Sequence, residues 1–231
     1  MPRYRMMYAK EGPARYISHL DLLRAFERAA RRAGLPLAFT LGFNPHPKIA
    51  FAAPLGVGTA GEREFADLEL TANMPPEEVA GALGRALPEG LRLIELRAVA
   101  DQAGALMTAV DRATYRAEAI LSRPVSAGEA ERAVAAFLSM PQILVEKKGR
   151  RGEKKVRDIK PGILAMSARV NDDIIVVEAE LKTGSSGNVR FEEVLDAFKE
   201  KSRLPVEGRF SLYRTGVYAA RGKEKKSLWH V

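Results

Sequence analysis

The sequence predicts an α+β protein built from two ferredoxin-like halves, each with the order β-α-β-β-α-β and an antiparallel sheet. Two observations support this fold class. Strand-like alternation and helix-like periodicity follow each other in that order from residue 3 to residue 99, and the same order returns from residue 114 to residue 219. The two halves share an architecture without sharing sequence. We therefore expect domains at 1–100 and 113–220, followed by a basic tail at 221–231.

In the first half, Ser18 is the expected start of a helix, because its hydroxyl can accept a hydrogen bond from the amide of Asp21. Gly34 and Pro36 then supply the end of this helix. The second helix opens at two prolines, which are tolerated in a first helical turn. The expected strands are 3–10, 35–41, 64–70 and 91–99, and the expected helices are 19–33 and 75–87.

The second half repeats this order with a longer connection in its middle. Its expected strands are 114–121, 142–147, 173–182 and 209–219, and its expected helices are 126–139 and 191–201. Residues 100–112 are expected to form a connection or a surface turn. The segment 156–170 is predicted as an insert that could add a further pair of strands.

Composition excludes several classes of protein. A hydrophobic content of 46% in 231 residues is ample for packed cores. No apolar run approaches about 18 residues and no basic-then-apolar start is present, so we expect a cytoplasmic protein without a membrane span or signal peptide. The chain has no cysteine and three histidines, so it has no thiol ligands for an iron–sulfur cluster and few ligands for a transition metal. We expect neither a cofactor nor a metal.

The net charge of +8 is concentrated in two segments. The end of the chain from Arg221 to Lys226 carries +3, and the rest outside the two segments sums to −1. Such clustering is typical of proteins that bind an anionic partner such as RNA, although it also serves solubility. The larger basic segment carries +6, and its cations are Lys147, Lys148, Arg150, Arg151, Lys154, Lys155 and Arg157.

Two further features near the first helix are candidates for RNA contact. The face of the helix opposite its apolar side carries Arg24, Arg28, Arg31 and Arg32, which are either phosphate contacts or simply a solvated face. The loop that follows carries Phe43, Asn44, His46 and Lys48 between prolines that restrict the backbone. This loop could stack a base and bind a phosphate. The alternative is a braced turn in which the phenyl ring plugs the core.

No group of side chains forms a convincing catalytic or metal site. His19, Asp21 and His46 would need the helix start and the loop to converge, and Asp21 is better explained as a capping residue. The remaining candidates for a divalent cation are four acids, expected to be exposed on an edge strand: Glu62, Glu64, Asp67 and Glu69.

The segment YISHLDLLRAFERAARRAGLPLAFTLGFNPHPKIAFAAPLGVG, residues 16–58, resembles the signature of the radical-SAM-linked protein family. This is a bacterial domain of unknown function that is fused to radical SAM proteins or encoded beside them. The resemblance covers roughly the first hundred residues well. It implies a bacterial cytoplasmic setting, an iron–sulfur partner protein and a link to RNA metabolism.

We therefore expect an RNA-binding accessory protein, without catalytic activity of its own, that presents tRNA or rRNA to a radical SAM partner. One alternative is a protein-interaction module that regulates this partner without nucleic acid. Another is a metal-independent enzyme that processes or modifies RNA. Residues 214–219 faintly resemble the active-site strand of tRNA pseudouridine synthases, but the aspartate nucleophile of those enzymes has no counterpart between Thr215 and Gly216.

Overall fold

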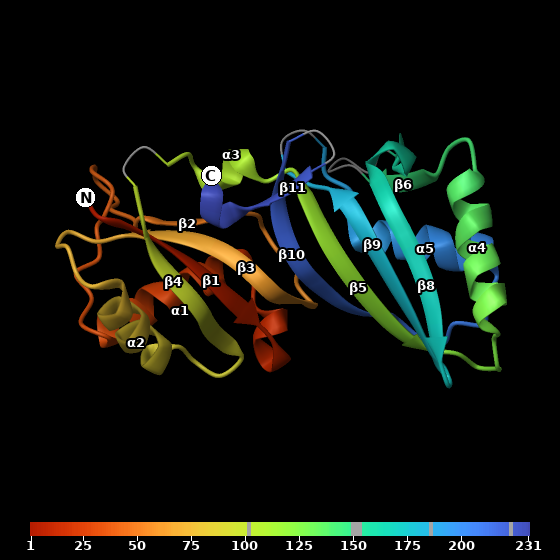
Figure 1. Ribbon diagram of the computed structural model, residues 1–231, viewed down its shortest axis with the longest axis horizontal. Helices are drawn as coiled ribbons and strands as arrows, with labels where there is room; N and C mark the ends of the chain where they lie inside the picture. Colours follow the sequence, from red (N-terminus) through yellow and green to blue (C-terminus); the bar gives the residue numbers. More distant parts are fainter. Residues whose placement is uncertain (101–102, 149–153, 185–186, 222–223) are drawn as a thin grey trace. The chain divides into compact units, whose positions relative to one another are not determined.

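The computed structural model describes residues 1–100, 103–148, 154–184, 187–221 and 224–231 (Figure 1). The protein is an α+β protein with a large β-sheet, and its chain divides into two compact units. The first unit comprises Met1–Asp111 and Arg214–Val231, and the second comprises Arg112–Tyr213. The first unit therefore includes the end of the chain, which the domain boundaries predicted from the sequence had left out.

The sheet of the first unit places its strands in the order β4, β1, β3, with the short β2 also paired to β3. Each of these pairs is antiparallel. Figure 1 shows α1 and α2 beside each other, next to strands β1 and β4. The elements are β1 (Arg3–Lys10), η1 (Gly12–Tyr16), α1 (His19–Arg32), β2 (Ile49–Phe51), β3 (Thr59–Glu69), α2 (Pro76–Ala86), β4 (Leu91–Val99) and α3 (Leu106–Ala109).

The core of this unit forms where β1 faces the helices. Tyr4, Met6 and Tyr8 alternate along β1 and are all buried, as their period-two spacing predicts. Phe26 of α1 packs against Tyr8 with a ring-centroid distance of 5.0 Å, in an edge-to-face arrangement. Ser18 caps α1 as predicted, since its side chain accepts a hydrogen bond from the amide of Asp21.

One strand predicted in this half is wrong. Residues 35–41 form no strand and make only two isolated bridges, Leu37 with Leu70 and Phe39 with Pro47. Pro36 at the start of the segment lacks an amide donor, which prevents a continuous ladder there. The strand that takes this place beside β3 is instead β2, which begins eight residues after the predicted strand ends.

In the second unit, β9 pairs with β5 on one side and with β8 on the other, antiparallel in both cases. Figure 1 shows α5 behind β8 and β9, and residues of both helices of this unit contribute to its hydrophobic core. The elements are β5 (Arg112–Ile120), α4 (Ala127–Ser139), β6 (Leu144–Lys148), β7 (Lys154–Asp158), η2 (Lys160–Gly162), β8 (Ile163–Asn171), β9 (Ile174–Lys182), α5 (Phe191–Ser202) and β10 (Ser211–Arg221), of which β10 continues into the first unit.

The predicted strand at 142–147 does not join this sheet. It forms β6, which pairs with β7 in a separate two-stranded hairpin, and β8 takes the place beside β9. The segment Asn171-Asp172-Asp173 explains the preference for β8, because it provides a tight turn in which Asp172 adopts a positive φ of 52°. The segment 156–170, which was predicted as an insert, therefore supplies β8 of the main sheet. The segment 142–147, which was predicted as a strand of that sheet, instead forms part of the separate hairpin.

The predicted basic tail is also wrong, because the end of the chain packs on the first unit. It forms β11 (Glu224–Ser227), which pairs with β10, and η3 (Leu228–His230). Leu228 is buried, and the ring of Trp229 lies 5.0 Å from that of Phe65 and 4.5 Å from the guanidinium of Arg97. Arg5 donates hydrogen bonds to the carbonyls of Leu228 and Val231. Apolar and polar contacts thus hold a segment that its charge alone predicts to be solvated.

Candidate nucleic-acid interface

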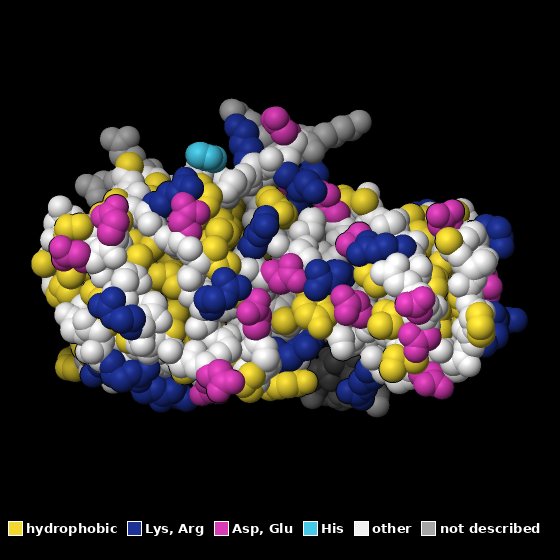
Figure 2. Space-filling view, turned by 60° about the horizontal axis from the view of Figure 1, so that its bottom comes forward, with side chains coloured by type: hydrophobic (Ala, Val, Ile, Leu, Met, Phe, Trp, Pro, Cys, Tyr) yellow, Lys and Arg dark blue, Asp and Glu magenta, His cyan; other side chains and the backbone are white. Residues whose placement is uncertain are grey.

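Helix α1 presents its arginines to solvent. Leu22, Phe26 and Ala29 are buried on one side of the helix. The opposite side carries four arginines that are all exposed: Arg24, Arg28, Arg31 and Arg32. Figure 2 shows Lys and Arg side chains, in dark blue, gathered at the lower left, where α1 and α2 lie in Figure 1.

Two of these arginines have local carboxylate partners. Arg24 lies 3.2 Å from Asp21, and Arg31 lies 2.8 Å from Glu27, the pairing that their spacing predicts. The hydrogen bond from Ser18, followed by those from Arg24, lowers the pKa of the Asp21 carboxyl. Exposed ion pairs of this kind contribute little to stability, so a phosphate can replace the carboxylate at little cost. Arg28 forms no ion pair with any residue in the described part of the chain.

The proline-rich loop holds two apolar side chains fully in solvent. Phe43 has a relative exposure of 107%, and Leu41 has one of 101%. The loop is closed by two hydrogen bonds, from the amide of Thr40 to the carbonyl of His46 and from the amide of His46 to the Thr40 hydroxyl. Asn44 and His46 are exposed as well. The alternative in which Phe43 plugs the core is therefore wrong.

Lys48 differs from the other predicted residues of the loop. Its ammonium lies 2.8 Å from a carboxylate oxygen of Glu69, and its side chain is 34% exposed. Its backbone continues toward β2, where its amide donates to Ala38 and its carbonyl accepts from Glu69. Lys48 thus anchors the base of the loop, and much of its charge is already balanced.

A contact of Arg31 joins the arginines of α1 to the segment that leads into the loop. The guanidinium of Arg31 lies 5.6 Å from the ring centroid of Phe39, directly before the loop closed by Thr40 and His46. The C-terminal end of the exposed helix face therefore adjoins the residue that leads into the exposed loop. We call the helix face and the loop together the helix–loop surface and define it by Arg24, Arg28, Arg31, Arg32, Phe43, Asn44 and His46.

The predicted basic hairpin lies in the second unit, as strands β6 and β7. Lys147 pairs in register with Lys155, and Lys148 with Lys154, while Arg150 and Arg151 fall outside the described residues. Lys155 is exposed.

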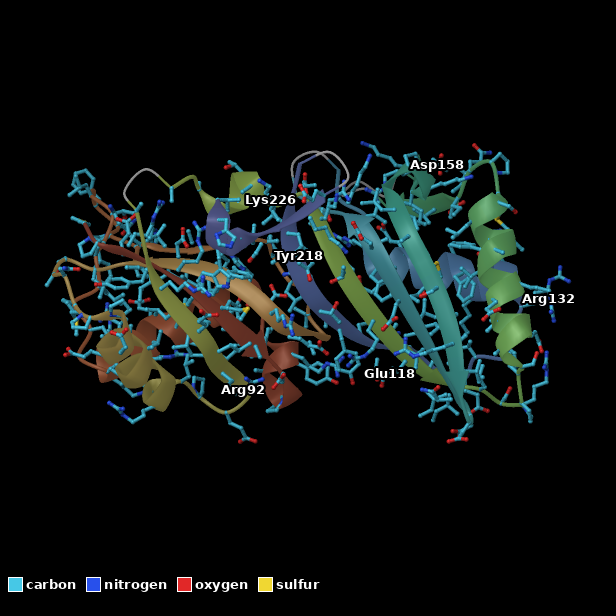
Figure 3. The ribbon with its side chains drawn as sticks, in the orientation of Figure 1. Arg92, Glu118, Arg132, Asp158, Tyr218 and Lys226 are labelled. Atoms are coloured by element: carbon cyan, nitrogen blue, oxygen red, sulfur yellow. The ribbon has the colours of Figure 1, made fainter. Side chains whose placement is uncertain are left out.

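The base of this hairpin is fixed by Arg157, which lies 2.5 Å from Glu193 of α5 and donates to the carbonyl of Asn188. Figure 3 labels Asp158, the next residue, whose carboxylate accepts from the amide of Ile143. Arg157 is thus an anchor for the hairpin, and its charge is paired.

Sequence reasoning missed a set of buried charges in the first unit. Arg214 of β10 forms a bidentate pair with Glu64 of β3, with N–O distances of 2.8 and 2.5 Å, and both side chains are 2% exposed. Its Nη1 donates to the carbonyl of Pro54, and its Nη2, besides bonding to Glu64, donates to the carbonyl of Ala53. Two of the four acids expected on an exposed edge strand, Glu64 and Asp67, are therefore buried, whereas Glu62 and Glu69 are partly exposed. The local sequence gave no signal of this pair, because Arg214 lies 150 positions from Glu64.

Two neighbours of this buried pair have shifted pKa values. Burial raises the pKa of the Tyr8 hydroxyl well above its ordinary value, and the charge of Glu64 adds to this effect. Burial lowers the pKa of Lys10, although Glu64 partly opposes the change. The ammonium of Lys10 donates to the carbonyl of Ile17 at 3.0 Å, so it fastens β1 to the segment before α1.

The grouping of His19, Asp21 and His46 is not assembled. Asp21 bonds to Ser18 and Arg24, the amide of His46 bonds to Thr40, and the ring of His19 packs edge-on against Phe51. Among the described residues, no cluster of three or more His, Cys, Asp or Glu could hold a metal ion. Of the four acids considered for a cation, Glu64, Asp67 and Glu69 are engaged by Arg214, Arg5 and Lys48.

The helices of the described part of the chain include none that is both long and apolar enough to span a membrane.

Comparison with known proteins gives a family but no activity. A family model described as "Uncharacterized protein conserved in bacteria (DUF2344)" matches residues 3–191. No curated protein matches this chain. Among solved structures, a chain of the crystal structure of a Cbf5-Nop10-Gar1 complex is similar, with a TM-score of 0.49 and 9% identity over 94% of this chain. This chain spans 48% of that one.

Two further structures are more distant. An unknown protein from Galdieria sulphuraria gives a TM-score of 0.26 and 14% identity, covering 93% of this chain and 99% of its own. A putative glycine cleavage system transcriptional repressor gives a TM-score of 0.23 and 8% identity, covering 93% and 98%. At such low identities, none of these structures assigns a function to this chain.

Proposed function

The chain belongs to the bacterial family of uncharacterized proteins DUF2344, and we propose that it is an RNA-binding accessory protein that presents tRNA or rRNA to a radical SAM partner enzyme. The observation that carries this proposal is the helix–loop surface. There, exposed guanidiniums of α1 reach Phe39 through Arg31, and the fully exposed phenyl ring of Phe43 follows four residues later in the chain.

Each part of the helix–loop surface suits a different part of an RNA strand. Guanidiniums bind phosphate oxygens in a bidentate manner, and an exposed ring offers a face on which an unstacked base can lie. The stiff loop lowers the entropy that Phe43 would lose on binding, because its backbone is already restricted by prolines and closed by Thr40. Cations and a stacking ring together are the features of proteins that bind single-stranded nucleic acid.

We propose further that each half of the protein is ferredoxin-like. In the first unit, the strand order β4-β1-β3-β2 with antiparallel pairing is the order of such a β-α-β-β-α-β unit. In the second unit, β5, β8 and β9 serve as the first, second and third strands, and their order β5-β9-β8 agrees with the same arrangement. The hairpin of β6 and β7 is then an insertion between α4 and β8.

The radical SAM partner is proposed from the resemblance of residues 16–58 and from the composition of the chain. A chain without cysteine cannot supply the thiolates of an iron–sulfur cluster, so such chemistry would have to come from another protein. When both are expressed together, the chain should co-purify with a radical SAM protein. It should also be colourless when purified alone. An iron–sulfur absorption band from this chain by itself would contradict the proposal.

A protein-interaction role without RNA is the second candidate, and one observation favours it. Leu41 is as exposed as Phe43, and an aliphatic side chain adds little to base stacking but fits an apolar pocket on a protein. Under this alternative, truncation of Leu41 should weaken partner binding as much as truncation of Phe43 does. Under the RNA proposal, the phenyl ring should matter far more than the leucine.

The decisive experiment removes two charges from the helix–loop surface. The variant Arg24→Gln/Arg28→Gln should bind a short single-stranded RNA and bulk tRNA more weakly. The slope of log affinity against log salt for the short RNA should fall by about 0.7 for each lost phosphate contact. The matched control is Arg92→Gln/Arg132→Gln, which removes the same charge from β4 and from the outer side of α4 (Figure 3). If both variants weakened RNA binding equally, the loss would be explained by net charge alone, and the proposed site would be refuted.

A further inference from the structure

The first unit contains a pocket between the C-terminal ends of α1 and α2. Its volume is about 380 Å³. Arg32 from α1 reaches across to the end of α2, where it donates a hydrogen bond of 2.6 Å to the carbonyl of Ala86. Three alanines keep the walls close to the two helix backbones. The lining residues are Arg32, Ala33, Ala82, Arg85 and Ala86.

The charge of this pocket is positive and unbalanced. Neither Arg32 nor Arg85 forms an ion pair with any described residue, and both are exposed. The acids on the same two helices are either paired with other residues or lie far from the pocket. Glu27 is paired with Arg31, and the acids of α2 lie in its first turn, at the end away from Arg85. Two guanidiniums without a carboxylate favour an anion between them.

Interaction with the helix ends accounts for only part of the positive charge of Arg32 and Arg85. Arginines in a last turn offset the partial negative charge of a helix C-terminus, and Arg32 satisfies one carbonyl there. Each helix end carries roughly half a negative charge, whereas the two arginines bring two positive charges. A guanidinium has five N–H donors, and the bond to Ala86 uses one of those on Arg32. Positive charge and donors therefore remain for a ligand.

We propose that this pocket binds a phosphate group of the RNA backbone, as a continuation of the helix–loop surface. The inference rests on the proposed function, because Arg32 lies one turn beyond Arg28 and directly after Arg31 on α1. A strand that follows the arginines of α1 toward the C-terminal end of the helix reaches the pocket there, at the end where Arg31 contacts Phe39. The pocket adds Arg85, a residue that no sequence pattern indicated, to the contacts of the RNA.

The test compares Arg32→Gln/Arg85→Gln with the control Arg92→Gln/Arg132→Gln in salt titrations of RNA binding. Two lost phosphate contacts should reduce the salt slope for a single strand by about 1.4, while the control should change it by less. The melting temperature of both variants should stay close to that of the wild type. If the wild type binds RNA and the pocket variant keeps its salt slope, the pocket inference is refuted and the proposed function stands.

A second titration separates failure of the pocket from failure of the proposed function. Inorganic pyrophosphate should raise the melting temperature of the wild type above that in chloride of equal ionic strength, and it should have less effect on the pocket variant. If the wild type binds no RNA but pyrophosphate still stabilises it through the pocket, the ligand is a free phosphorylated molecule, and the inference of an RNA phosphate is wrong. If neither titration depends on Arg32 and Arg85, the pocket has only a structural role.

Discussion

Replacing Phe43 with Ala tests whether the proline-rich loop is a binding element. The phenyl ring is 107% exposed, so its removal uncovers no buried area and leaves no cavity. The free energy of unfolding should therefore change by no more than about 0.5 kcal/mol. Phe26 provides the contrast, because it is 1% exposed, and truncation of a buried phenylalanine costs about 3–5 kcal/mol.

The same substitution should weaken RNA binding. A lost base stack costs about 1–3 kcal/mol, which corresponds to a roughly 5- to 140-fold increase in Kd. Urea denaturation and fluorescence anisotropy with a labelled single-stranded RNA should be measured on one preparation of each of three variants, Phe43→Ala, Leu41→Ala and Phe26→Ala. A Kd for Phe43→Ala that equals the wild-type value would refute the stacking argument. A large loss of stability in the same variant would refute the structural argument.

Three further predictions concern charge. Glu64→Gln leaves Arg214 buried without a counter-charge and should lower the free energy of unfolding, measured in urea, by about 3–5 kcal/mol. Glu69→Gln breaks a partly exposed pair and should lower it by about 0–1 kcal/mol. Equal losses in the two variants would contradict the burial argument. Because burial and Glu64 raise the pKa of Tyr8, the stability that this neutral hydroxyl contributes is complete below about pH 10 and is lost as pH rises through the folded pKa. The difference in unfolding free energy between wild type and Tyr8→Phe should therefore change only above about pH 10. A difference that stays constant up to about pH 11 would contradict this prediction. Charge reversal in the hairpin should keep the fold but weaken RNA binding and flatten its salt dependence in a mobility-shift titration, and an unchanged affinity would favour the interaction-module alternative. The reversed residues are Lys147, Lys148, Arg150 and Arg151.

Local signals predicted most of the elements. Ser18 and its hydrogen bond to the amide of Asp21 define the start of α1, as expected from the capping pattern. The strict alternation of residues 91–99 gives β4 with the predicted limits. These predictions succeed because a cap or an alternating face is determined by residues within a few positions of one another.

The features that the sequence did not indicate depend on distant partners. Glu64 and Arg214 are 150 positions apart, so no local pattern shows that the acid has a buried counter-charge. Similarly, β6 and β8 are both plausible strands, and the choice between them depends on which one pairs with β9. The exposure of Phe43 follows from the loop closure by Thr40, whereas a phenylalanine by itself favours the interior.

The most direct test of RNA binding at the helix–loop surface is ultraviolet crosslinking of the protein to RNA in living bacterial cells. Crosslinked peptides would be mapped by mass spectrometry and the attached RNA would be sequenced. The proposed function predicts crosslinks within residues 24–48, centred on Phe43, with tRNA or rRNA attached. Recovery of no RNA, or of crosslinks confined to other parts of the chain, would contradict it.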